Sequence, residues 1–143
     1  MQFTEIKQNY YRSIMVWLIL LTFMVFLIII IGGLTRLTDS GLSMVDWQPL
    51  LGTIPPLDYI QWMEVFEQYK LTPEYIYVNK NMELEEFKFI FWWEWFHRFF
   101  ARLIGIVFIF PFIYFYLKKY LNSFFYKRFT IIFGLGLIQA FVG

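Results

Sequence analysis

Four ionisable side chains gather where a long apolar stretch begins, namely Glu94, His97, Arg98 and Arg102. The chain has a single histidine, so any imidazole chemistry belongs to His97. Ionisable groups at membrane depth cost several kcal/mol unless they are paired or face a cavity. This cost makes the four residues the candidates for a functional site.

Helical spacing places Glu94, His97, Ala101 and Gly105 on one stripe, because successive members are three or four residues apart. An imidazole can bind iron axially, and the two small residues below it would leave room for the edge of a flat macrocycle such as haem. The stripe is therefore compatible with a haem ligand at His97, with Glu94 beside it.

Arg98 and Arg102 could pair with the propionates of such a haem. The same spacing also permits a structural interpretation. His97 would then pair with Glu94 or with interfacial water, the small residues would only allow close helix packing, and both arginines would extend towards the headgroups. Spacing alone leaves both interpretations open.

Composition indicates a membrane protein, since 59% of the 143 residues are hydrophobic and 24% are aromatic. A soluble domain of this length could not bury so much apolar surface, and we expect the lipid bilayer to cover it. The net charge of +1 gives no case for a nucleic-acid partner. The absence of cysteine excludes disulfides, Cys-ligated zinc and iron–sulfur clusters from this chain.

Three apolar runs predict an all-α integral membrane protein, a transmembrane helical bundle with about three spans in a single membrane domain. We expect span one at 13–34, a helix leading into span two at 90–117, and an incomplete third span at 128–143. Pro111 is expected to kink the second.

Lysine and arginine flank span one on its N-terminal side and fill the link at 118–127, which places both segments in the cytoplasm. The loop at 35–89 has an excess of acidic residues and is expected on the outer, periplasmic side.

A helical pattern follows Pro55 and Pro56 in this loop and has an aromatic face. That face comprises Tyr59, Trp62, Met63, Phe66 and Tyr69. We expect an interfacial helix on the outer leaflet, with a packed loop helix as the alternative.

The segment GGLTRLTDSGLS, residues 32–43, carries glycines that would permit tight turns. Its hydroxyls and Arg36 could hold an anion. An ordinary exit loop with Arg36 at the end of the span is the plainer alternative.

Four ordered motifs carry a family resemblance: GGLTRLTDSGLSMVDWQPLLGTIPP, PEY at 73–75, EFKFIFWWEWFHRFFARLIG and GLIQAFVG. Together they resemble the haem A synthases of the cytochrome oxidase assembly family, of alphaproteobacterial and mitochondrial type. The resemblance covers nearly the whole chain. The absence of cysteine matches the branch without the loop cysteine pair found in some bacterial relatives.

The resemblance implies an architecture of two four-helix halves, of which this chain is the N-terminal portion. It implies oxidation of the C8 methyl of haem O to the formyl group of haem A, with haem b as cofactor and one haem site per half held by paired histidines. By position, His97 matches the first axial ligand of the iron, Glu94 matches a carboxylate implicated in catalysis, and Arg98 completes the motif.

The resemblance also implies a setting. We expect the bacterial inner membrane in preference to the mitochondrial one, with the N-terminus in the cytoplasm. Haem O synthase, cytochrome oxidase assembly factors and a second copy of the chain are the expected partners.

With one histidine, this chain cannot form a bis-histidine site alone. We expect it to be part of a longer protein, or else part of a split or oligomeric one, and to be inactive by itself. Two rival functions remain open: a non-catalytic b-type membrane cytochrome and a haem-free assembly subunit.

Overall fold

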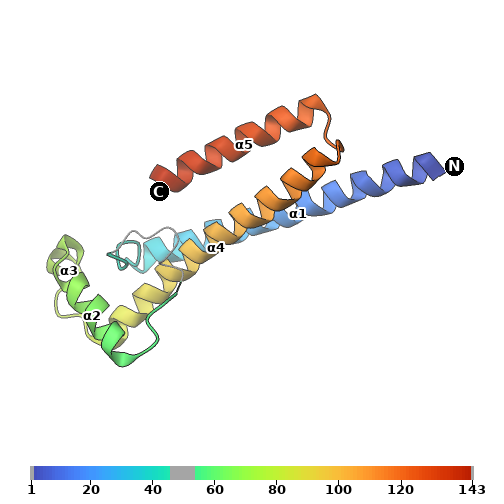
Figure 1. Cartoon of the computed structure of the whole chain (residues 1–143). Helices are drawn as coiled ribbons and strands as arrows, with labels where there is room; N and C mark the ends of the chain where they lie inside the picture. The colour runs from blue at the N-terminus through green and yellow to red at the C-terminus, as the bar shows by residue number, and fades with distance from the viewer. Residues whose placement is uncertain (1, 46–53, 143) are drawn as a thin grey trace. The chain divides into compact units, whose positions relative to one another are not determined.

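The computed structural model describes residues 2–45 and 54–142; the remainder of the predicted outer loop, 46–53, lies outside them. The described residues form the helices α1 (Gln2–Leu37), α2 (Tyr59–Lys70), α3 (Pro73–Tyr77), α4 (Leu84–Leu117) and α5 (Ser123–Val142) (Figure 1). They fold into two compact units, Phe23–Leu103 on one hand and Met1–Thr22 with Ile104–Gly143 on the other. The predicted all-α class is confirmed for this part of the chain.

Within the described residues, two helices are long and apolar enough to cross a membrane, α1 over Tyr10–Leu37 and α4 over its whole length. α1 contains the predicted span 13–34. The 34 residues of α4 give a helix about 51 Å long, whereas a bilayer core is about 30 Å thick. Part of α4 must therefore extend beyond the hydrocarbon.

Two helices begin earlier than the apolar runs that predicted them. α4 starts at Leu84 rather than at residue 90, and the Glu86 carboxylate accepts the backbone N–H of Glu83 at 2.9 Å. α5 starts at Ser123 rather than at residue 128, with the Asn122 side chain accepting the Phe125 N–H at 3.0 Å. Capping polar residues, which hydropathy does not register, set both starts.

The end of α1 is closed by a left-handed residue, Asp39, with φ of 49°. The Ser40 N–H donates to the Thr35 carbonyl at 2.9 Å, which is the bond of a Schellman motif. No glycine in the described residues has a positive φ, so no glycine supplies the left-handed residue of this turn. Gly32 and Gly33 lie inside α1 instead.

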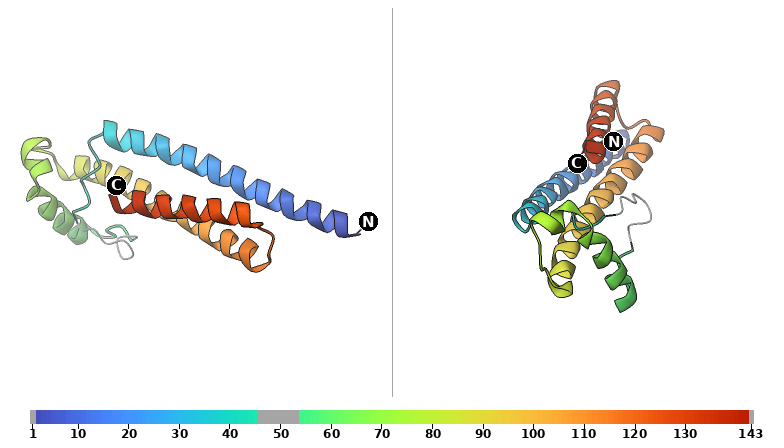
Figure 2. Two further views of the ribbon diagram at one scale, coloured as in Figure 1. Left: turned by 90° about the horizontal axis from the view of Figure 1, so that it is seen from above. Right: turned by 90° about the vertical axis from the view of Figure 1, so that its left-hand side faces the viewer.

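α2 buries its aromatic face against the first turns of α4, as the neighbouring ribbons in Figures 1 and 2 show. The buried cluster consists of Trp62, Phe66, Tyr69, Phe87, Ile90 and Phe91. Tyr59, expected on the same face, is 66% exposed. The cluster favours the packed loop helix over the interfacial helix, because α4 covers the rings that lipid was expected to cover.

Tyr69 has no exposed surface, like Phe87 of the same cluster. Burial raises the pKa of its hydroxyl, although the hydrogen bond that it accepts from Asn79 at 2.7 Å lowers it. The hydroxyl therefore stays neutral at physiological pH, as a buried aromatic core requires.

In the other unit, α5 turns back along α4 (Figure 2). The rings of Phe108 and Phe133 stack between these helices at 5.9 Å, and Trp17 of α1 lies in the same apolar cluster. Trp17 also makes a specific polar contact, because its Nε1 donates to the Val107 carbonyl at 2.8 Å.

The Val107 carbonyl lacks its usual helical donor because of Pro111. Proline has no backbone N–H, and the residue four positions before it loses its usual helical hydrogen bond. The residue four positions before Pro111 is Val107, within α4. Trp17 therefore replaces the bond that Pro111 removes.

We expect Trp17→Phe to lower the free energy of unfolding of the complete protein by about 1 kcal/mol, because the Val107 carbonyl then loses its donor. Pro111→Ala restores a backbone donor, so Trp17→Phe should cost less in that background. A double-mutant cycle of unfolding in detergent measures the difference. Equal costs in both backgrounds would contradict this account.

Candidate functional site

Glu94 lies almost fully buried on α4, with 3% of its surface exposed. Its Oε2 accepts hydrogen bonds from the Ser43 hydroxyl at 2.7 Å and from the Met44 N–H at 2.8 Å. Its Oε1 lies 2.5 Å from Nη2 of Arg98, one helical turn away, in an ion pair whose alignment is not that of a hydrogen bond. A buried carboxylate is tolerated when it is paired in this way. The ion pair therefore compensates the negative charge of Glu94, and the hydrogen bonds hold the carboxylate in one orientation.

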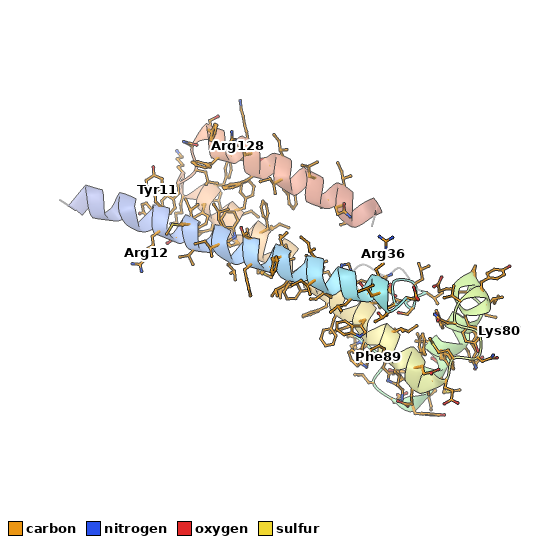
Figure 3. All side chains as sticks on the ribbon, turned by 180° about the vertical axis from the view of Figure 1, so that it is seen from behind. Tyr11, Arg12, Arg36, Lys80, Phe89 and Arg128 are labelled. Atoms are coloured by element: carbon orange, nitrogen blue, oxygen red, sulfur yellow. The ribbon has the colours of Figure 1, made fainter. Side chains whose placement is uncertain are left out.

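The two donors to Oε2 come from the segment that follows α1, and sequence reasoning did not single out either of them. Ser40 and Ser43 are both fully buried. The hydroxyls of this segment were expected to hold an anion, and Ser43 holds one that belongs to the chain itself, the carboxylate of Glu94. Arg36 takes no part, because it is exposed at the end of α1 (Figure 3).

His97 follows Glu94 by three residues and is half-buried. Its Nε2 faces α1 at Gly32, where an added Cβ would lie only 3.1 Å from that nitrogen. At the adjacent Gly33 an added Cβ meets nothing within 4 Å. Gly32 is thus the residue whose missing side chain leaves space beside the imidazole.

The other predicted site residues are placed differently. Arg98 contacts Glu94, and its predicted pairing with a propionate stays a prediction. Arg102 is half-buried and Ala101 is exposed. Gly105 falls in the other compact unit, and an added Cβ there meets nothing within 4 Å.

The residues around His97 fit the predicted haem. No group of three or more metal-ligating side chains occurs in the described part of the chain. A single imidazole can still hold a haem iron, because the macrocycle brings its own nitrogen ligands. Gly32 allows the imidazole to approach the backbone of α1 closely, because any side chain there would meet Nε2.

Comparison with known proteins agrees with the motifs. The family model described as cytochrome oxidase assembly protein (COX15-CtaA) matches residues 15–143. The chain is 49% identical over 134 residues to a haem A synthase of Flavobacterium psychrophilum, which covers 92% of this chain and 40% of that protein. It is also 49% identical over 142 residues to a haem A synthase of Nitrosospira multiformis, covering 99% of this chain and 40% of that protein.

A haem A synthase of Rhodopseudomonas palustris is 45% identical over 132 residues, which are 92% of this chain and 36% of that protein. The chain thus spans about 40% of the length of the curated relatives that it matches. No solved structure matches it. The predicted resemblance is confirmed: this chain belongs to the cytochrome oxidase assembly protein (COX15-CtaA) family of polytopic membrane proteins.

Proposed function

We propose that this chain is the N-terminal part of a haem A synthase, which oxidises the C8 methyl group of haem O to the formyl group of haem A. Relatives that bear this name match nearly the whole chain at 49% identity. The observation that carries the proposal is a buried, oriented carboxylate at Glu94, three residues before an imidazole whose Nε2 faces the bare backbone of Gly32.

In this proposal His97 would hold the iron of haem b, and the absence of a side chain at Gly32 would keep Nε2 unobstructed. The bound haem supplies the activation of oxygen. Ala101 would accommodate the ring edge, and Arg98 and Arg102 would pair with propionates.

Glu94 has two possible tasks beside that ligand: it moves a proton, or its negative charge stabilises positive charge that develops on the substrate methyl group. Its fixed contacts support a catalytic position in both cases, because they hold the carboxylate in place before the substrate binds. Haem O is the proposed substrate.

We further propose three spans in the bacterial inner membrane, with the N-terminus in the cytoplasm. The cationic turn after α4, with Lys118 and Lys119, supports this orientation. Haem O synthase, cytochrome oxidase assembly factors and a second copy of the chain are the proposed partners.

The test uses the complete protein that contains this chain, purified from membranes and supplied with haem O, a reductant and oxygen. We expect haem A as the product, identified by chromatography and mass spectrometry. Bound but unmodified haem would instead indicate a non-catalytic cytochrome. A complete protein without a Soret band would indicate a haem-free assembly subunit.

A further inference from the structure

We propose that Ser43, with the backbone N–H of Met44, is the positioning element for Glu94, so that the segment after α1 sets the orientation of the carboxylate beside His97. This inference rests on the proposed function, because it assigns Ser43 a role through Glu94. It extends that function to residues outside the helix on which the site was predicted.

The Ser43 hydroxyl has three acceptors within reach: Oε2 of Glu94 at 2.7 Å, the Ser40 carbonyl at 3.1 Å and the Ile90 carbonyl at 3.4 Å. A hydroxyl has only one proton to donate. Hydrogen bonds to an ionised acceptor are the shorter and stronger ones. The proton of Ser43 therefore points to Glu94.

Oε2 of Glu94 receives a second donor, the Met44 N–H at 2.8 Å. Consecutive residues thus supply a side-chain donor and a backbone donor to the same oxygen, which uses both of its lone pairs. Rotation of the carboxylate would break both bonds at once. Arg98 fixes the other oxygen from within α4.

The segment after α1 is itself held in place, so it can orient the carboxylate of Glu94. Backbone hydrogen bonds hold the segment, since the Ser40 N–H donates to the Thr35 carbonyl at 2.9 Å and the Thr38 N–H donates to the Leu34 carbonyl at 3.0 Å. Ser40 and Ser43 have no exposed surface. An internally bonded turn with two buried serines loses little entropy when it orients a charged group.

Ser43→Ala in the complete protein should lower kcat for haem A formation about tenfold, because one charge-assisted hydrogen bond to Glu94 is lost. The KM for haem O and the Soret spectrum should stay unchanged, since Ser43 touches neither substrate nor His97 ligation in this account. Ser40→Ala is the matched control, because it removes an equally buried hydroxyl from the same turn. The Ser40 hydroxyl contacts Thr38 rather than Glu94.

Hydrogen exchange gives a readout that does not depend on activity. Glu94→Ala should speed exchange of the Met44 amide, because its acceptor is removed. This variant also tests the contact from the α4 side if Ser43→Ala fails to fold.

The outcomes separate this inference from the proposed function. If the unaltered complete protein converts haem O but Ser43→Ala matches Ser40→Ala in kcat, the positioning role is overturned. Unchanged exchange of the Met44 amide in Glu94→Ala overturns it as well. If the unaltered protein forms no haem A while Met44 exchange responds to Glu94→Ala, the contact stands and the proposed function fails.

Discussion

His97→Ala in the complete protein is expected to abolish haem A formation and to alter the spectrum of the bound haem. His97 is the sole imidazole in this chain, so no neighbouring side chain of the same kind can replace it as an iron ligand. An alanine has no ligand atom, and the site at Gly32 would be left without its nitrogen. Haem A is measured by chromatography of extracted haems, and ligation by the Soret band.

Phe89→Ala is the control for this experiment. Phe89 lies on the same helix, is 57% exposed and contacts Trp93 rather than the site (Figure 3). It should reduce neither haem A formation nor the Soret band. Full activity of His97→Ala would contradict the ligand assignment.

Gly32→Leu should reduce haem binding at this site as strongly as the loss of His97. Even a Cβ at this position would lie 3.1 Å from Nε2, closer than ordinary van der Waals contact, so the further carbons of leucine would fill the space beside the nitrogen. The imidazole ring of His97 must then turn away from Gly32, or the leucine side chain blocks Nε2 from the proposed haem iron. Haem content per protein and the Soret spectrum measure this effect.

The adjacent glycine provides a matched control. Gly33→Leu adds the same side chain to the same helix, where a Cβ meets nothing within 4 Å. It should leave haem content and spectrum unchanged. If Gly32→Leu and Gly33→Leu bind haem equally well, the proposed role of Gly32 beside His97 is wrong.

Much of the candidate site could be predicted from local spacing. Glu94 and His97 are three residues apart on a helix, and this periodicity belongs to any α-helix whatever packs against it. The apolar runs likewise predicted α1 and α4, because hydrophobicity over about 20 residues reports lipid contact directly. The helix starts lie outside the apolar runs, because single polar caps decide them.

The surroundings of the aromatic face of α2 could not be predicted from local sequence. Periodicity identified the face, but the same pattern suits a headgroup layer or a neighbouring helix. Packing against Phe87 and Phe91 decided for the helix. The spacing of residues within α2 does not reveal whether headgroups or another helix cover this face.

The sequence by itself determined the family and the all-α class, and it predicted the two residues at the centre of the candidate site, because ordered motifs and helical periodicity are local properties. Only the tertiary structure revealed the partners of those residues. Ser43 meets Glu94 across 51 residues, and Gly32 makes room for His97 from another helix. Such contacts depend on how two helices are rotated and shifted against each other, which is set by the packing of whole surfaces rather than by any one segment.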